Sequence, residues 1–281
     1  MNFLKKVIYV KITSSYYGNI LILGRTNVGK STLLNLLINK KISIISHKKN
    51  TTNNNIIGVY NNDIYQISFI DTPGNIFYKN KIFNLFKNYE YNYILFILDK
   101  NRWNYIEENF TKIFSKINIP IILIINKVDQ IKNKNILLSY INFIQKKIKI
   151  FHLFIISAKY KLYTNDICSF ICKHLPKQKH FYSSSYITNQ TDKTIIKEII
   201  RENIMKFLHK EIPYNIKIKV VFPKNLLNKL YIFLLVNKIN YKKIIIGKNS
   251  KNIKLIKKRS EQNIEKFFHK KIILNIWIKI K

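Results

Sequence analysis

The chain has 281 residues, of which 50 are Lys or Arg and 14 are Asp or Glu, so its formal net charge at pH 7 is +36. This length predicts two domains, and a hydrophobic content of 47% is enough to build a packed core in each. No apolar run reaches the length of about 18 residues that a membrane-spanning helix needs. The composition therefore excludes an integral membrane protein of helical type, and we expect a cytoplasmic protein.

The lysine excess is unevenly spread along the chain. Abundant Ile, Asn, Lys, Tyr and Phe beside only 6 Gly and 5 Pro are typical of an AT-rich genome, so part of the charge reflects mutational bias. Residues 187–281 nevertheless carry 23 basic and 6 acidic side chains, a higher density of net charge than the first 186 residues have. This asymmetry predicts a polyanionic partner for the C-terminal part.

Near the N-terminus, the segment GRTNVGKST matches the phosphate-binding pattern G-x-x-x-x-G-K-[ST]. It follows the apolar run 20–23 and precedes the helical segment 33–37, where this motif belongs. Lys30 is expected to reach the β- and γ-phosphates of a nucleoside triphosphate, and the Ser31 hydroxyl to bind Mg²⁺. The predicted phosphate site comprises Gly24, Arg25, Thr26, Asn27, Val28, Gly29, Lys30, Ser31 and Thr32.

Three further motifs follow apolar runs and indicate guanine rather than adenine. In the first, Asp71 can hold the Mg²⁺ shell and the amide of Gly74 can contact the γ-phosphate. In the second, Asp129 can accept two hydrogen bonds from N1–H and the exocyclic amine of guanine, which adenine does not offer. In the third, backbone N–H groups of residues 157–159 are placed to contact the guanine O6. These motifs add Asp71, Thr72, Pro73, Gly74, Asn75, Asn126, Lys127, Val128, Asp129, Ser157, Ala158 and Lys159 to the predicted nucleotide site.

Each motif is weak alone, but all four stand in order at the C-terminal ends of apolar runs. Doubly wound α/β sheets bind their ligands at that edge. The sequence therefore predicts an α/β fold with a mostly parallel, doubly wound sheet and a site for GTP or GDP.

The order and spacing of these motifs resemble the Era family of translation-associated GTPases, from about residue 18 to residue 281. The resemblance is carried by the strings Gly24–Leu34, Lys41–Ile44, Thr51-Thr52, Asp71–Gly74, Arg102-Trp103, Asn126–Asp129, His174–Pro176, Tyr186–Thr188, Glu198–Glu202, Ile212–Tyr214 and Ile245–Gly247.

The resemblance implies a first switch in the polar stretch 47–55, which without the P-loop would read as an ordinary loop. Thr52 is the better candidate there for the Mg²⁺ contact, with Thr51 as the alternative, so Ser31, Thr52 and Asp71 are the predicted metal ligands.

The residue after Gly74 bears on the mechanism of hydrolysis. Ras-like GTPases place a water-orienting Gln at this position, whereas Era-type enzymes usually carry an apolar residue, and this chain has Asn75. The resemblance implies that Asn27 binds a K⁺ ion in place of an arginine finger. We therefore expect slow, K⁺-stimulated GTP hydrolysis. The predicted catalytic residues are Asn27, Lys30, Thr52, Gly74 and Asn75.

The segment after Pro176 predicts a second domain with the element order α-β-β-α-α-β, which resembles a type II KH domain. We expect a GTPase domain over residues 1–180, a linker over 181–189 and a KH-like RNA-binding domain over 190–281. The elements expected in the second domain are a helix over 192–209, strands over 216–222 and 230–236, the apolar run 244–246, a turn at 247–250, a helix over 253–268 and a strand over 272–280.

The RNA-binding loop of such domains has the pattern G-x-x-G, but here Ser250 stands at the second glycine. Its Cβ is expected to restrict the approach of a phosphate or to require a negative φ, so RNA binding is weakened but kept. Trp277 in the last strand is expected to lie in the core rather than to stack on bases. The predicted RNA-binding residues are Ile246, Gly247, Lys248, Asn249, Ser250, Lys251 and Lys254.

Two hypotheses follow. In the first, GTP switches a monomeric protein that binds 16S rRNA near its 3′ end and assists assembly of the 30S ribosomal subunit; the rRNA target comes from the resemblance alone. In the second, the protein is an RNA-binding assembly scaffold that binds GTP structurally with negligible turnover. A tRNA-modifying relative is disfavoured because the GTPase domain starts near residue 18 and a KH-like segment follows it. The resemblance also implies peripheral association with the inner face of the cell membrane.

Overall fold

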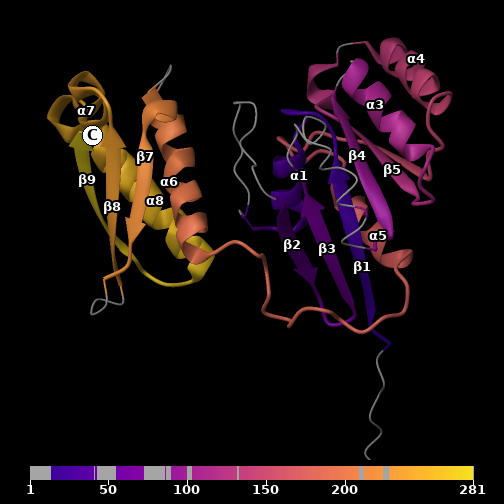
Figure 1. Ribbon diagram of the computed structural model, residues 1–281, viewed down its shortest axis with the longest axis horizontal. Coiled ribbons are helices and arrows are strands. Elements are labelled where there is room, and N and C mark those ends of the chain that lie inside the picture. The colour runs from indigo at the N-terminus through magenta and orange to yellow at the C-terminus, as the bar shows by residue number, and fades with distance from the viewer. Residues whose placement is uncertain are drawn as a thin grey trace, which may run out of the picture.

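The computed structural model describes residues 14–40, 42, 55–72, 86, 90–99, 103–131, 133–208, 212–223 and 228–280. These residues carry two β-sheets, each with its own helices (Figure 1). Among the described helices, none is both long and apolar enough to cross a membrane. The helices and strands are β1 (Tyr16–Leu23), α1 (Lys30–Leu37), β2 (Ile56–Asn61), β3 (Tyr65–Asp71), β4 (Tyr93–Asp99), α3 (Tyr105–Phe114), β5 (Ile121–Asn126), α4 (Lys134–Gln145), β6 (His152–Ile155), α5 (Asn165–Lys173), α6 (Asp192–Phe207), β7 (Lys217–Val221), β8 (Lys229–Val236), α7 (Ile239–Ile246), α8 (Lys251–Phe268) and β9 (Ile273–Ile280).

The first sheet has six strands in the order β2-β3-β1-β4-β5-β6. β2 is antiparallel to β3, and the other described pairings in this sheet are parallel. The carboxyl ends of β1, β3, β4 and β5 therefore lie along one edge, where Ile22 is opposite Asp71 and Asp99 is opposite Asn126. The predicted α/β fold with a mostly parallel sheet is confirmed.

Both faces of this sheet are covered, which is why its central strands are continuous apolar runs. On one face Ile22 packs in a buried cluster with Leu33 of α1 and Ile167 of α5. On the other face Leu21 packs with Phe110 of α3 and with residues of α4. Neighbouring residues of β1 thus belong to opposite cores, as the alternation of a strand requires.

The second sheet has the strand order β7-β8-β9, with β7 antiparallel and β9 parallel to the central β8. Its buried core joins Ile200 of α6 and Ile256 of α8 to Ile232 and Leu234 of β8. The element order α6-β7-β8-α7-α8-β9 is the one predicted for a type II KH domain, which is confirmed. The prediction for Trp277 was wrong, because this side chain is 44% exposed on the face of the sheet that the helices leave open.

The segment that connects the two sheets is hydrogen-bonded to the first sheet. It follows the edge of the first sheet, where Lys177 pairs with Tyr16 and Thr188 pairs with Gly58. The backbone N–H of Val59 in β2 donates to the carbonyl of Ile187 at 2.8 Å. The expected polar linker is therefore bound along β2 and β3, which occupies the hydrogen-bonding groups of an edge strand.

Candidate nucleotide-binding site

The loop between β1 and α1 has the backbone that a phosphate cradle needs. Gly24 and Gly29 have φ values of 148° and 106°, and Asn27 between them has a φ of 65°. A Cβ on Gly24 would overlap the carbonyl of Ile97, and one on Gly29 would overlap the side-chain amide of Asn126. Glycine is therefore required at both positions by conformation and by space. This geometry turns successive N–H groups toward the interior of the loop, as in an anion-binding nest.

Lys30 begins α1 and reaches back over this loop. Its ammonium donates to the carbonyls of Gly24 and Arg25, each at 2.8 Å, and the side chain is only 7% exposed. Burial lowers the pKa of Lys30 to about 8, against the opposing effect of the Asp71 charge. The charge is thus held in a poorly solvated position that a bound polyphosphate would favour strongly.

We expect GTP binding to take up a proton at Lys30. The free protein holds this amine about three-quarters deprotonated at pH 8.5, given its pKa of about 8. A bound triphosphate raises the pKa, so each binding event takes up roughly 0.7 proton at pH 8.5, and affinity falls about fourfold between pH 7 and pH 8.5. Titration calorimetry in two buffers of different ionisation enthalpy measures the uptake.

Lys30→Arg is the control for this prediction, because a guanidinium stays charged at this pH and takes up no proton there. Equal heats for the parent chain in the two buffers would contradict the assignment of the proton to Lys30.

Ser31 and Asp71 supply oxygen atoms beside Lys30. The Ser31 hydroxyl donates to Oδ2 of Asp71 at 2.9 Å, and the Asp71 side chain is fully buried at the end of β3. A hydroxyl and a carboxylate are hard ligands of the kind that Mg²⁺ prefers. Ser31 and Asp71 therefore have the oxygen atoms that would suit a magnesium ion bound together with the nucleotide. Thr72, in contrast, uses its hydroxyl internally and donates to the carbonyl of Ile22 at 2.9 Å.

Asn126 joins three separate segments of the site. Its side-chain amide donates to the carbonyl of Val28 at 2.8 Å, and its Oδ1 accepts from the N–H of Ala158 at 3.0 Å. The neighbouring Lys127 has a left-handed backbone with a φ of 63°, and its ammonium donates to the carbonyl of Asn27 at 2.5 Å. The end of β5 thus holds both the phosphate loop and the loop of residues 157–159.

Asp129 stands at the open side of this junction, in a short 3₁₀ segment over Val128–Gln130. Its side chain is exposed, and Oδ1 accepts a hydrogen bond from the Ser157 hydroxyl at 2.5 Å. A carboxylate oriented by one hydrogen bond can still accept two more from a planar donor pair such as that of guanine. Lys159 follows, with its ammonium 4.8 Å from the ring centroid of Tyr160.

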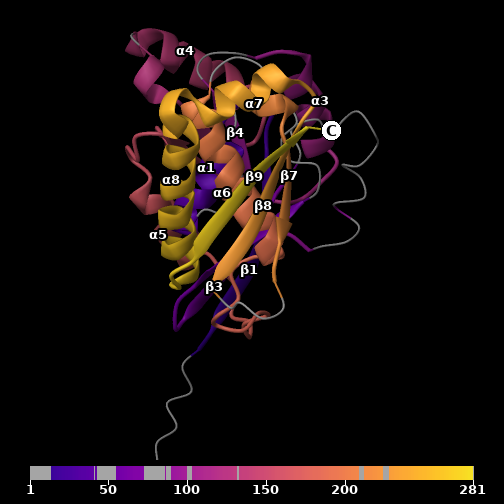
Figure 2. The same ribbon diagram turned by 90° about the vertical axis from the view of Figure 1, so that its left-hand side faces the viewer.

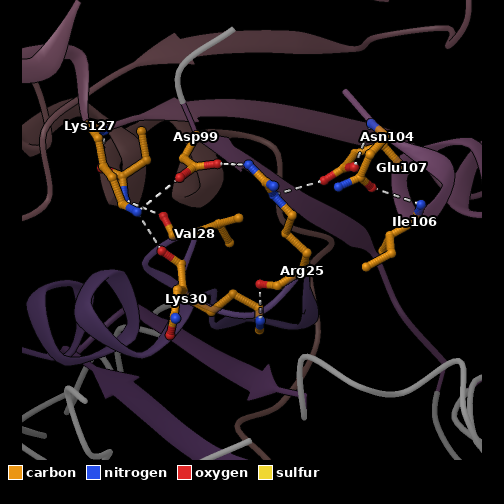
Figure 3. Close-up of polar contacts among 10 residues, drawn as sticks. Arg25, Val28, Lys30, Asp99, Asn104, Ile106, Glu107 and Lys127 are labelled. Atoms are coloured by element: carbon orange, nitrogen blue, oxygen red, sulfur yellow. Dashed lines mark hydrogen bonds and ion pairs between the residues drawn. The ribbon is translucent and has the colours of Figure 1, made fainter. Parts of the chain in front are cut away.

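The sequence did not predict an ionic network that links the phosphate loop to α3 and to the ends of β4 and β5 (Figure 3). Arg25 pairs with Asp99 at the end of β4, and its Nε lies 3.2 Å from Oε1 of the fully buried Glu107 in α3. Lys127 completes the network, with its ammonium 2.9 Å from Oδ2 of Asp99. One signal could have found Asp99, because it ends an apolar run at the same sheet edge as Asp71.

The two carboxyl groups of this network respond differently to their surroundings. Burial raises the pKa of Glu107, and the charge of Arg25 only partly opposes this effect. Burial also acts on Asp99, but the hydrogen bond from Lys127 and the charges of Arg25 and Lys127 outweigh it and lower its pKa. Asp99 is therefore the carboxyl group of this network that is stabilised as an anion, and it orients Arg25 and Lys127 beside the loop.

Three residues of the predicted nucleotide site, Pro73, Gly74 and Asn75, lie outside the described residues, as does the predicted metal ligand Thr52. The others surround one edge of the first sheet. Of the remaining residues of the phosphate loop, Val28 is buried in the core, and Thr26 and Thr32 are half-buried.

The loop between α7 and α8 carries the predicted RNA-binding residues. Gly247 has a φ of 72°, and Asn249 and Ser250 also have positive φ values of 52° and 60°. The expectation that Ser250 would require a negative φ was therefore wrong, because a serine is held here in the left-handed region at some cost in strain. Ile246 is half-buried, whereas Lys248, Lys251 and Lys254 are exposed and Asn249 with them, so a cationic loop faces solvent.

Comparison with known families supports both parts of this description. A family model described as a 50S ribosome-binding GTPase matches residues 19–127, and one described as a KH domain matches residues 233–281. GTPase Era of Buchnera aphidicola subsp. Acyrthosiphon pisum (strain APS) is 42% identical over 284 residues, which cover 97% of this chain and 100% of that protein. GTPase Era of Vibrio cholerae serotype O1 is 33% identical, over 99% of this chain and 89% of that protein.

Solved structures give the same result. A crystal structure of Era in complex with MgGDPNP and nucleotides 1506–1542 of 16S ribosomal RNA matches with a TM-score of 0.78 at 32% identity, over 95% of this chain and 94% of that one. A structure of Aquifex aeolicus Era bound to GDP.AlF4- matches with the same TM-score and coverage. Both similarities extend over the nucleotide-binding motifs and the KH domain. The chain therefore belongs to the Era family of GTPases.

Proposed function

We propose that this chain is a GTP-driven switch that binds 16S rRNA near its 3′ end and assists assembly of the 30S ribosomal subunit. The observation that carries the proposal is the junction at Asn126, which ties the phosphate loop and the loop of residues 157–159 into one site. The same chain presents a cationic KH loop around Lys248. The related Era structure that contains MgGDPNP and nucleotides 1506–1542 of 16S ribosomal RNA supports the same ligands here.

In this proposal the phosphate loop holds the triphosphate, and three oxygen ligands hold a magnesium ion. Lys30 would neutralise the β- and γ-phosphates, and Ser31, Asp71 and Thr52 would hold Mg²⁺, whose positive charge would stabilise the charge that develops on the transferred phosphoryl group. The buried Asp71 and its 2.9 Å contact with Ser31 support this set. The backbone amide of Gly74 would contact the γ-phosphate and so distinguish GTP from GDP.

Guanine is selected on the other side of the site. Asp129 accepts the hydrogen bonds of N1–H and the exocyclic amine. The loop of residues 157–159 is the proposed partner of O6, and because the N–H groups of Ser157 and Ala158 donate to the carbonyl of Leu162 and to Oδ1 of Asn126 in the structure, they would have to exchange these partners to contact O6. The 2.5 Å hydrogen bond from Ser157 supports this role, because it orients the Asp129 carboxylate from the side of the same loop.

We divide the chain into a GTPase domain over residues 1–180, a linker over 181–189 and a KH domain over 190–281. The bound linker offers a route for coupling, since Asn189 accepts from the N–H of Ile57 at 3.0 Å. Ile57 lies in β2, which begins four residues after Thr52. Ordering of Thr52 by the γ-phosphate would thus reach the linker through one strand.

The test compares RNA affinity in the two nucleotide states. An RNA that matches the 3′ end of 16S rRNA is expected to bind at least about fivefold more tightly in the GTP-analogue complex than in the GDP complex. Measurable turnover that rRNA accelerates is expected alongside. Identical affinities in both states would refute the coupling, and negligible turnover with normal RNA binding would favour the scaffold hypothesis.

K⁺ stimulation is a separate prediction for the catalytic residues. We expect hydrolysis to be at least about tenfold faster in K⁺ than in Na⁺, because a K⁺ ion held by Asn27 would supply positive charge to the reacting phosphates, and tenfold corresponds to about 1.4 kcal/mol in the barrier. Asn27→Ala abolishes the difference between the two salts, whereas Asn75→Ala retains it. Phosphate release under single-turnover conditions measures both rates, and equal rates in the two salts for the parent chain would contradict the role of K⁺.

Residues 246–251 and Lys254 are the proposed site for single-stranded RNA in the KH domain. The exposed Lys248, Lys251 and Lys254 support this assignment, since phosphate contacts supply most of the affinity for an RNA backbone. The monomeric state, the cytoplasmic location and the peripheral association with a membrane stay predictions.

A further inference from the structure

The KH sheet has one covered face and one open face. Helices α6 and α8 pack on one side, and Figure 2 shows β9, β8 and β7 in front with α6 behind them. The G-x-x-G-like loop belongs to the covered side, because it joins α7 to α8. The opposite face of the sheet therefore has no assigned role in nucleotide or RNA binding.

The alternation along the strands defines which side chains lie on the open face. In β8, Leu230, Ile232, Leu234 and Val236 are buried in the core, so the residues between them point away from the helices. The pairing register places equivalent residues of β7 and β9 beside them. The open face is thus formed by Lys217, Lys219, Val221, Lys229, Tyr231, Phe233, Leu235, Ile273, Asn275, Trp277 and Lys279.

Three aromatic rings stand together at the centre of this face. Trp277 lies opposite Phe233 in the register, with ring centroids 5.4 Å apart and an interplanar angle of 20°. Tyr231 meets Trp277 edge-on, with a centroid distance of 5.2 Å and an angle of 62°. Trp277 nevertheless remains 44% exposed. Two neighbours therefore hold the indole in place while leaving much of its surface accessible to solvent.

Lysines surround these rings. Lys217, Lys219, Lys229 and Lys279 are exposed on the same face, and the ammonium of Lys279 lies 4.9 Å from the ring centroid of Phe233. Within the three strands, whose residues are all described, none is Asp or Glu. An anionic occupant that also offers flat apolar groups to the rings would therefore complement this face.

We propose that the open face of the KH sheet is a second binding surface for single-stranded RNA, on which bases stack against Trp277 and its neighbours while the flanking lysines hold phosphates. Single-stranded nucleic acid combines the two required properties, because every base has a π-face and every linkage carries a charge. The binding is tolerant of sequence, since no hydrogen-bonding code is needed for stacking. This surface adds to the loop site proposed above, and the two lie on opposite sides of one sheet.

Fluorescence anisotropy with a labelled uridine-rich RNA, on the order of eight nucleotides long, tests the proposal in the full-length chain. Trp277→Ala is expected to weaken binding by about 5-fold to 100-fold, the range for loss of one stacked base. Lys219→Glu is expected to weaken it and to reduce its salt dependence. Lys266→Glu is the matched control, because Lys266 is exposed on α8 and the change in net charge is the same.

A spectroscopic readout separates stacking from a structural role. The chain has two tryptophans, so Trp103→Phe leaves Trp277 as the sole indole reporter. RNA is expected to quench its emission, and this result remains informative if Trp277→Ala fails to fold. Absence of quenching when the RNA is bound would overturn the proposal, as would equal effects of Lys219→Glu and Lys266→Glu.

Lys248→Glu in the loop keeps this proposal distinct from the function proposed above. Loss of RNA binding in Lys248→Glu with no loss in Trp277→Ala or Lys219→Glu would confine RNA to the loop and overturn the second surface. If the parent chain bound no RNA, the rRNA function itself would fail. A dimer that dissociates in Lys219→Glu without RNA would assign the face to a second copy and also overturn the proposal.

Discussion

Replacement of Asp129 by asparagine is expected to exchange the base preference of the site from guanine to xanthine. The carboxylate accepts hydrogen bonds from two guanine donors, and an amide in its place presents its own donor to one of them. Loss of two charge-assisted hydrogen bonds is expected to lower GTP affinity by roughly 100-fold to 10,000-fold. Xanthosine triphosphate, which has a carbonyl where guanine has the amine, gains affinity by a similar factor. Competition among GTP, XTP and ATP against a fluorescent nucleotide measures the exchange.

One hydrogen bond of Asp129 is expected to survive its replacement by asparagine, so the loop structure can be checked separately from base recognition. Oδ1 of Asp129 accepts from the Ser157 hydroxyl at 2.5 Å, and the amide oxygen of asparagine can accept the same bond. The loop of residues 157–159 is therefore expected to keep its place, and the melting temperature of the nucleotide-free variant to match that of the parent. A variant that still prefers GTP over XTP would show that Asp129 does not read the base.

Lys30→Ala is expected to weaken GTP binding by roughly 30-fold to several thousand-fold. Removal of one partner from a buried, hydrogen-bonded charge pair costs about 2–5 kcal/mol. Lys30 is only 7% exposed, and its ammonium is 2.8 Å from each of two loop carbonyls. The hydrolysis rate is expected to fall as well, because the lysine also neutralises charge on the γ-phosphate. Equilibrium binding of a fluorescent GTP analogue and single-turnover hydrolysis measure the two effects.

Without nucleotide, the Lys30→Ala variant is expected to be at least as stable as the parent chain. A lysine whose pKa is lowered from 10.5 to about 8 by folding carries a cost below pH 8, which declines as the pH rises toward 10.5. Alanine removes that cost at pH 7, so the nucleotide-free Lys30→Ala chain should melt no lower than the parent. A clear drop in its melting temperature would mean that Lys30 supports the fold, and the loss of binding would then lose its simple explanation.

The phosphate loop could be predicted from the sequence because its chemistry is local. Nine consecutive residues from Gly24 to Thr32 form the cradle, and the motif marks Gly24 and Gly29, two of the three residues with positive φ, but not Asn27. Asn126 and Asp129 were also predictable, since each stands at or just after the end of an apolar strand. Parallel strands bring such ends to one sheet edge whatever the intervening loops contain.

The support behind the loop was not predictable in this way. Arg25 and Asp99 are 74 positions apart, and Glu107 comes from the first turn of a helix that reaches the loop only in the folded chain. An acidic residue in the first turn of a helix normally serves as a cap or as a partner of the helix dipole. Its burial beside an arginine depends on how α3 packs against the sheet, and that information is not local.

The sequence by itself determined the type of each domain, the nucleotide loop and the motifs that read guanine, because each of these depends on short-range spacing and on strand ends. The tertiary structure alone decided that Arg25 is clamped by Asp99 and Glu107, that the linker is bound along β2, and that Trp277 faces solvent. In β9 both alternating sets of residues include large apolar side chains, such as Ile276 and Trp277. Which set is buried is decided by the helices that cover one face of the sheet, and no pattern within the strand states where those helices will pack.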